Sequence, residues 1–140
     1  MAYSYEITLQ VPFHDLDPMR IVWHGNYFKY FDRARFALFD AAGIDLYGYM
    51  TEKQIAFPIT RTSTKHIAPL KSRDQVVCKA TVTEARFKIA MEFEIRRLPD
   101  RQLCVRGRSE QLAVKYPDME LEFEIPQEIQ TALGFGCLVA

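Results

Sequence analysis

Three ionisable side chains stand close together in this sequence, directly before an aromatic segment. His14, Asp15 and Asp17 lie within four positions, and His24 follows after a short loop. Carboxylates and imidazoles are the side chains that most often serve enzymes as general acids, general bases and nucleophiles. Residues 14–24 therefore predict acid–base or nucleophilic chemistry, which a following helix would have to position.

Asp17 precedes Pro18, and this pair has two interpretations. An Asp-Pro pair commonly begins a turn, in which the carboxylate accepts hydrogen bonds from the local backbone. Alternatively, the Asp17 side chain projects beside the start of the helix and acts as a nucleophile or general base. The sequence leaves both interpretations open.

His24 and Gly25 come directly before Asn26, which is the expected N-cap of the helix. The N-terminus of a helix has unpaired N–H groups and a partial positive charge, so a developing oxyanion would be stabilised there. Gly25 would let a ligand approach the backbone closely. Ordinary capping, with His24 on the surface, is the alternative.

A metal site is the weakest of the chemical possibilities. His14, Asp15, Asp17 and His24 include suitable ligands, but their spacing matches no metal motif, so we expect no metal and no cofactor. His14 and Asp15 are interpreted as residues that form hydrogen bonds within the turn. The sequence also lacks a nucleophile elbow, a Walker-type phosphate loop and a dinucleotide-binding glycine pattern.

Composition narrows the class of protein. The 140 residues include 18 basic and 18 acidic side chains, which indicates one domain over residues 1–140 without a general affinity for nucleic acid or anionic membranes. We expect no signal peptide and no membrane span, since no apolar run approaches roughly 18 residues. The cysteines fit neither a disulfide framework nor a zinc site, so we expect core residues of a reduced, cytoplasmic protein. They are Cys78, Cys104 and Cys137.

Basic residues occur in two groups after the helix. Solvated strand ends are their ordinary explanation, but ammonium and guanidinium groups also bind phosphate, so some could hold a phosphate-bearing ligand. The first group is Arg61, Lys65, Lys71 and Arg73, and the second is Arg86 and Lys88.

The expected elements are one long helix and several strands. Residues 26–42 carry apolar side chains over an arc of roughly 200°, which is typical of a helix embraced by a curved sheet, and Gly43 is placed to end this helix in a left-handed conformation. Arg35 falls within the apolar arc, where we expect a partner subunit to supply its counter-ion. Phe36 falls among the polar positions.

Alternating apolar and polar residues predict the strands. In residues 3–13 the apolar face ends at Phe13, and in 87–97 it begins at Phe87. This order predicts an α+β fold, an antiparallel sheet of about five strands wrapped around one central helix, with exposed edges that favour dimers. The remaining segments are strands at 56–67, 75–83, 102–115 and 120–125, with a short helix after Pro126.

Residues 11–44, VPFHDLDPMRIVWHGNYFKYFDRARFALFDAAGI, resemble the signature of the 4-hydroxybenzoyl-CoA thioesterase family, within the hotdog-fold acyl-CoA thioesterases. The matching pattern is an aromatic strand end, Asp-x-Asp, a Val-aromatic-His-x-Asn-Tyr segment and a helix with an aromatic-x-x-Ala-Arg sequence. These parts correspond to Phe13, residues 15–17, residues 22–27 and residues 31–35. Pro18-Met19-Arg20 departs from the family's usual loop, which leaves the acyl pocket, and hence the substrate, undetermined.

The resemblance implies a hotdog fold assembled into homodimers and often homotetramers. It further implies that Asp17 is the catalytic carboxylate and that the backbone N–H of His24 polarises the thioester carbonyl. Gly25, Asn26, Tyr27 and Trp23 would shape the substrate site. The expected phosphate-binding residues are Arg61, Lys65, Arg86 and Lys88.

The expected function is therefore hydrolysis of an acyl-CoA thioester. Two alternatives stay open: a thioesterase acting on acyl groups carried by acyl carrier protein, and a non-catalytic protein that binds acyl thioesters. A hotdog dehydratase is less expected, because the helix offers Asp32 and Asp40 but no histidine.

Overall fold

The computed structural model describes residues 3–135, and its main element is a five-stranded antiparallel sheet. The strands lie in the order β1-β4-β5-β6-β3. Their bounds are Ser4–Gln10 for β1, Ile59–His66 for β3, Gln75–Glu84 for β4, Ile89–Arg97 for β5 and Gln102–Gln111 for β6.

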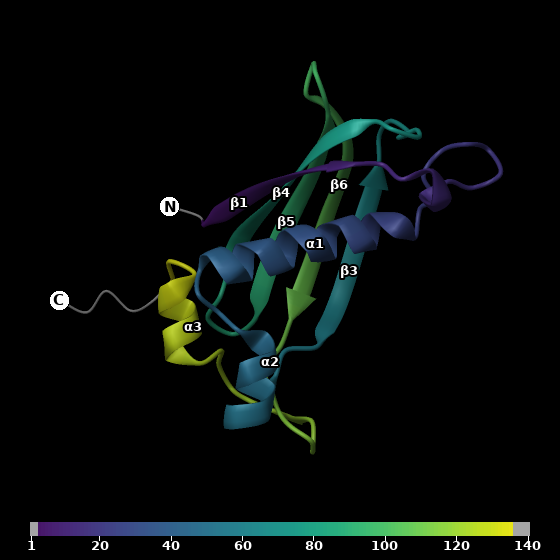
Figure 1. Cartoon of the computed structure of the whole chain (residues 1–140). Helices are drawn as coiled ribbons and strands as arrows, with labels where there is room; N and C mark the ends of the chain where they lie inside the picture. Colours follow the sequence, from purple (N-terminus) through teal and green to yellow (C-terminus); the bar gives the residue numbers. More distant parts are fainter. Residues whose placement is uncertain (1–2, 136–140) are drawn as a thin grey trace.

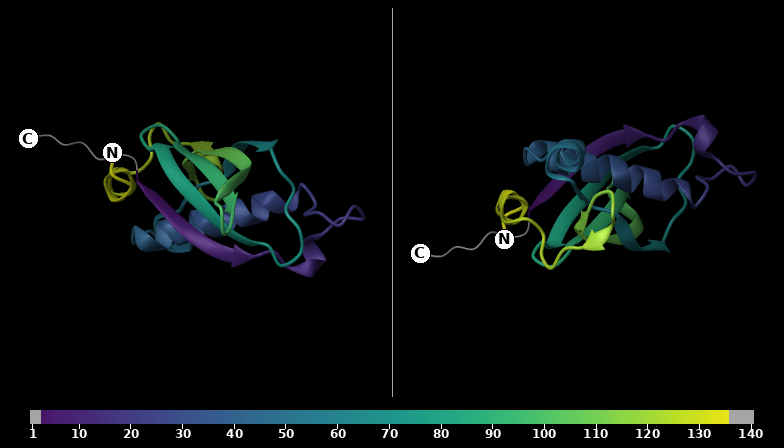
Figure 2. Two further views of the ribbon diagram at one scale, coloured as in Figure 1. Left: turned by 90° about the horizontal axis from the view of Figure 1, so that it is seen from above. Right: turned by 90° about the horizontal axis from the view of Figure 1, so that it is seen from below.

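Helix α1 (Asn26–Ala41) packs against one face of this sheet (Figure 1). Its N-terminal end and the loop over residues 11–25 lie beyond the strands at one end of the molecule (Figure 2). The predicted α+β arrangement of a sheet around one central helix, the hotdog fold, is confirmed.

The smaller elements lie mostly at the opposite end of α1. Strands β2 (Ile55–Ala56), β7 (Val114–Lys115) and β8 (Glu120–Leu121) form a second sheet. The helical segments are η1 (Phe13–Asp15), α2 (Leu46–Gly48), η2 (Tyr49–Lys53) and α3 (Gln127–Ala132). The helical turns of α2 and η2 were not predicted, whereas the short helix after Pro126 is confirmed.

Aromatic packing fixes α1 on the sheet. Phe31 of α1 stacks on Phe93 of β5 with ring centroids 4.7 Å apart. Gly107 of β6, paired with Phe93 across the ladder, leaves the space that the Phe31 ring fills. Burying a phenylalanine side chain contributes about 1.5–3 kcal/mol, so this contact is a substantial part of the helix–sheet interface. At the far end of α1, Gly43 has φ +76°, and the predicted left-handed termination is confirmed.

Arg35 finds its counter-ion within the same chain, so the expectation of a partner subunit is wrong for this residue. The side chain is 3 % exposed and pairs with Asp32, one helical turn earlier. It also donates to the Ser109 hydroxyl at 2.8 Å. Residues three apart lie on the same face of a helix, which is why α1 itself can neutralise this charge. Burial lowers the pKa of Arg35, against the opposing effect of Asp32.

Several strand boundaries differ from the predictions because pairing ends before the alternation does. Phe13 and Phe87, expected to face inward, are 79 % and 45 % exposed, since β1 ends at Gln10 and β5 begins only at Ile89. Pro58 divides the predicted strand 56–67, because proline has no N–H to donate to the ladder. The strand expected at 102–115 changes sheets after Gln111, and the one expected at 120–125 pairs only over Glu120–Leu121.

Two of the three cysteines lie within the described residues. Cys78 and Cys104 are buried free thiols, as expected for core residues. Burial raises the pKa of the Cys78 thiol to about 12, so it stays protonated near neutral pH. The prediction for Cys137 falls outside the described residues.

Gly107→Ala should destabilise the fold, because the new Cβ would lie 2.3 Å from a carbon of the Phe31 ring. We expect a loss of about 1–3 kcal/mol in the free energy of unfolding, measured by urea denaturation. In a Phe31→Leu background the same change should cost less, since the crowded ring is gone. Equal costs in the two backgrounds would show that the ring contact is not the cause.

Candidate functional site

Asp15 holds the loop over residues 11–25 to the first turns of α1. Its side chain is 2 % exposed. Lys29 Nζ donates to Oδ1 at 2.6 Å, and the Tyr30 hydroxyl donates to Oδ2 at 2.7 Å. The Asp15 carbonyl oxygen accepts hydrogen bonds from the backbone N–H of Trp23 at 3.0 Å and the side-chain amide of Asn26 at 2.9 Å. Asp15 therefore joins the helix and both ends of the loop, a larger role than the turn hydrogen bonds expected of it.

The ionisation of Asp15 follows from these contacts. Burial opposes the charged form, but the hydrogen bonds from Lys29 and Tyr30 outweigh it and lower the pKa of the carboxyl. Burial and the Asp15 carboxylate raise the pKa of the Tyr30 hydroxyl, which stays a donor. The clamp is thus a carboxylate held by two donors near neutral pH.

Asp17 lies in a tight loop closed by an isolated bridge between Leu16 and Val22. Its backbone N–H donates to the Ile21 carbonyl at 2.8 Å, and its Oδ1 accepts from the Met19 N–H at 2.8 Å. This is the turn that the Asp-Pro pair indicates. Within residues 3–135, no hydrogen bond engages Oδ2. The turn fixes one carboxylate oxygen and leaves the other available, so the two interpretations of Asp17 are compatible.

The N-cap of helix α1 lies one residue earlier in the sequence than expected. Gly25, not Asn26, is the N-cap, and no side chain caps the helix there. The Asn26 amide is instead committed to the Asp15 carbonyl. In the described part of the chain, neither the N–H of His24 nor that of Gly25 donates to a protein acceptor. The start of α1 therefore presents two adjacent free N–H groups.

A pocket of about 320 Å³ opens at this end of the molecule and brings together Asp17, His24 and Tyr27. Burial raises the pKa of Tyr27. A fourth polar residue, His66, lines the pocket from the end of β3. His66 is not among the predicted site residues. The remaining walls are apolar and consist of Met19, Ile21, Val22, Ile67, Ala68 and Pro69.

His66 approaches the site from the sheet. Its ring centroid is 5.2 Å from that of Tyr27 and 6.5 Å from that of His24. In the sequence His66 is a lone histidine in a strand of threonines, and no spacing links it to the Asp-x-Asp segment. Only the pairing of β3 with β6 places it there.

The other residues predicted around the helix N-terminus do not line the pocket within one chain. Trp23 is 49 % exposed and its ring lies 5.0 Å from the His24 ring. A Cβ on Gly25 would lie 2.2 Å from an indole carbon of Trp23, so the glycine makes room for this ring. Asn26 serves the loop through Asp15. Their contact with a substrate stays a prediction.

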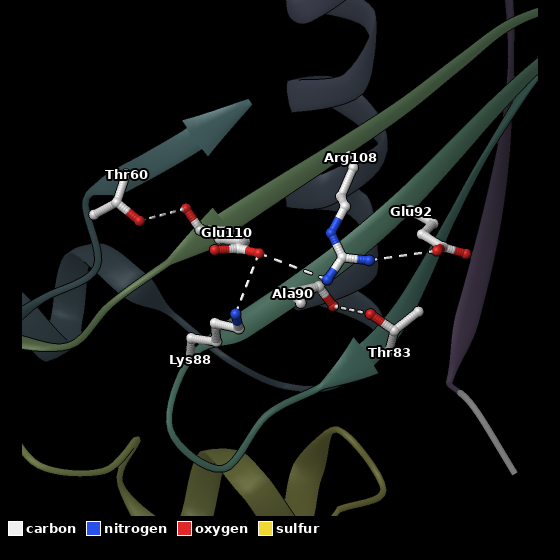
Figure 3. A network of polar contacts seen from close by, with 7 residues as sticks. All are labelled: Thr60, Thr83, Lys88, Ala90, Glu92, Arg108 and Glu110. Atoms are coloured by element: carbon white, nitrogen blue, oxygen red, sulfur yellow. Dashed lines mark hydrogen bonds and ion pairs between the residues drawn. The ribbon is translucent and has the colours of Figure 1, made fainter. Parts of the chain in front are cut away.

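None of the predicted phosphate-binding residues lines this pocket within one chain, although Lys65 directly precedes His66. Arg61 and Lys65 belong to β3, and Arg61 is roughly 16 Å along the strand from His66 at about 3.3 Å per residue. Lys88 Nζ pairs with Glu110 at 3.2 Å, in the network that Arg108 and Glu92 continue (Figure 3).

Arg86 is also engaged elsewhere, in an ion pair with Glu124 at 3.1 Å. The structure therefore does not bring the four predicted cations together around Asp17, and their role in binding phosphate stays a prediction.

Residues 3–135 contain neither a candidate metal site nor a candidate membrane-spanning helix. No group of three His, Cys, Asp or Glu side chains in this range lies close enough to hold a metal ion. No helix of this part of the chain is long and apolar enough to cross a membrane.

A protein-family model matches most of this chain. The family model of the thioesterase-like superfamily matches residues 11–133. No curated protein sequence gives a significant match.

Solved structures share the fold at low sequence identity. A 1,4-dihydroxy-2-naphthoyl-CoA thioesterase from Synechocystis has a TM-score of 0.87 at 20 % identity, over 94 % of this chain and 96 % of that one. The 4-hydroxybenzoyl-CoA thioesterase of Pseudomonas sp. strain CBS-3 has a TM-score of 0.82 at 22 % identity, over 94 % and 99 %. A DHNA-CoA thioesterase from Staphylococcus aureus has a TM-score of 0.79 at 20 % identity, over 86 % and 80 %.

Asp15→Asn should lower the free energy of unfolding by about 2–4 kcal/mol at pH 7, because it removes a buried charge-assisted clamp. The folded pKa of Asp15 lies below the unfolded value of 3.8. Its contribution is therefore fully present above that value and is lost as pH falls through the folded pKa.

Urea unfolding of wild type and variant at several pH values tests this linkage. The difference in unfolding free energy should shrink below about pH 4. Asp40→Asn is the matched control, because Asp40 is an exposed residue of α1. A difference that does not depend on pH would contradict the assignment of an ionised clamp.

Proposed function

The chain belongs to the thioesterase-like superfamily, and on that premise we propose that it hydrolyses acyl-CoA thioesters to the free acid and CoA. One observation carries the proposal: a largely apolar pocket gathers the Asp17 carboxylate and His24, at the start of α1. Apolar walls suit an acyl group, and the few polar groups are of the kind that acyl transfer requires.

The helix N-terminus supplies the electrophilic half of the mechanism. A thioester carbonyl oxygen placed at the free N–H of His24 would receive a hydrogen bond and the favourable field of α1. The N–H of the next residue, Gly25, is also free of a protein acceptor, although Gly25 itself does not line the pocket. Such donors stabilise the negative charge that develops on the oxygen in the tetrahedral transition state.

Asp17 supplies the nucleophilic half. In one route its carboxylate attacks the carbonyl carbon, expels the thiolate and forms a mixed anhydride that water then hydrolyses. In the other route the carboxylate removes a proton from a water molecule, and the resulting hydroxide attacks. Both routes need a carboxylate oxygen that is free of the protein, and Oδ2 fits this requirement.

Coenzyme A is the favoured carrier of the acyl group. The structural neighbours from Synechocystis and Pseudomonas are thioesterases named for CoA substrates. The exposed basic residues of β3, Arg61 and Lys65, would suit the phosphates of CoA, and equally an acidic acyl carrier protein. Thiol release from matched acyl-CoA and acyl-carrier-protein substrates separates these carriers, and saturable binding without thiol release would indicate a non-catalytic protein.

We further propose that the protein is a homodimer, with a homotetramer as a second level of assembly. Strand β3 is an eight-residue edge of the five-stranded sheet, and its residues are mostly exposed. An edge of this length is a ready template for pairing with another strand. Light scattering coupled to size-exclusion chromatography measures the oligomeric state directly.

Asp17→Asn should lower kcat on an acyl-CoA thioester by about 10²–10⁴-fold, because the amide can neither attack nor accept a proton. Thermal unfolding should change little, since the oxygen of the new side-chain amide can still accept the turn hydrogen bond that Asp17 receives. The measurement is thiol release under saturating substrate, with Asp40→Asn as control. Near-full activity of the Asp17 variant would overturn the site assignment.

A single turnover in H₂¹⁸O tests how Asp17 acts. Only direct attack creates an anhydride, so only that route can leave ¹⁸O in the side chain of Asp17. Mass spectrometry of the peptide containing Asp17 detects the label, and its presence would establish the anhydride route.

A further inference from the structure

His66 lines the pocket, but the mechanism proposed above gives its side chain no role. Asp17 and His24 belong to the loop and to the start of α1, whereas His66 comes from the sheet, on β3. It is followed in the pocket wall by the apolar residues 67–69. A reacting group bound at Asp17 and His24 would therefore have one imidazole facing it from a different element.

The surroundings of His66 leave one side of its ring free. Thr64, on the same face of β3, has its hydroxyl 3.2 Å from His66 Nε2. A hydroxyl both donates and accepts, so this contact is kept whether the imidazole is neutral or protonated. Within residues 3–135 no hydrogen bond engages Nδ1. The titratable groups of the pocket around it are Asp17, His24 and Tyr27.

We propose that His66 is a general acid that protonates the leaving thiolate of the substrate, an inference that rests on the proposed thioesterase function. As the new C–O bond forms, the C–S bond breaks and its electron pair stays on sulfur. The proton of the His66 imidazolium moves to that sulfur, which leaves a free thiol and a neutral imidazole.

The proton balance closes in both routes. If Asp17 attacks, neutral His66 takes a proton from the water that hydrolyses the anhydride, and the acid form is restored. If Asp17 is the base, the water proton passes from Asp17 to solvent, and His66 regains a proton from solvent. In each case one water is consumed, and one acid and one thiol are formed.

General acid assistance depends on the leaving group, which separates it from a structural role. An alkyl thiol, as in CoA, leaves as a basic thiolate and benefits from a proton, whereas an aryl thiol of low pKa leaves readily without one. A residue that only shapes the pocket would affect both leaving groups alike. A variant that loses the proton donor should therefore change the ratio of the rates on the alkyl and aryl thioesters, whereas a variant that only alters the pocket should not.

The test uses two small thioesters of the same acyl group, one with N-acetylcysteamine and one with thiophenol as the thiol. His66→Gln should lower kcat about 10²-fold on the alkyl thioester and leave it within about threefold of wild type on the aryl thioester. Thr62→Val, a β3 residue on the same face but outside the pocket, is the matched control. Both rates come from one sample, so a partly unfolded variant leaves their ratio unchanged.

Other results would contradict the proposed role of His66 or the proposed function. Equal losses on both thioesters, or no loss on the alkyl one, would overturn the role of His66. A selective loss in His24→Gln instead of His66→Gln would assign the proton to the other imidazole and overturn it equally. Asp17→Asn should slow both thioesters strongly, and a wild-type protein inactive on alkyl and CoA thioesters would refute the proposed function itself.

Discussion

The burial of one carboxylate, Asp15, is the constraint on which this end of the molecule depends. An ionised carboxylate inside a protein is unstable unless donors surround it, and Lys29 and Tyr30 provide them from α1. The same residue's carbonyl oxygen holds Trp23 and Asn26. These bonds fix the loop relative to the helix, and Asp17 and His24 line the same pocket at the start of α1. The geometry of the candidate site is thus a consequence of satisfying a buried charge.

The helix owes its own position to a steric match with the sheet. Phe31 fills the space that Gly107 leaves in β6 and stacks on Phe93 of β5. The contact sets how closely α1 approaches the strands. It thereby sets the distance between the helix N-terminus and the end of β3, the two walls of the pocket. The packing of Phe31 in the middle of the molecule and the geometry of the pocket at its end are therefore linked through helix α1.

Much of this arrangement could be read from the sequence, and the exceptions have physical causes. The helix was predictable because its apolar arc and Gly43 are local signals, and the strands because alternation is local as well. That Asp17 and His24 line one pocket was predictable because they share one short segment. His66 was not, since its contacts with Tyr27 and His24 depend on strand pairing between distant segments. The pairing of Arg35 with Asp32, one turn away, does not follow from the sequence, because spacing alone does not reveal which rotamers meet.

The short sequence separations within the Asp15 clamp have a consequence for how such a site can be built and transferred. Its side-chain contacts join residues only 11, 14 and 15 positions apart. Closing loops of this length costs little conformational entropy, so the segment from Asp15 to Tyr30 behaves as a nearly self-contained cassette. It carries both the proposed nucleophile, Asp17, and the proposed oxyanion donor, the N–H of His24. The opposite wall consists of His66, at the end of β3, and residues 67–69 after it, and is supplied by the host sheet. Variation of residues 67–69 alone could therefore change the substrates of such a protein, while Asp17, the N–H of His24 and the proposed acid His66 remain as they are.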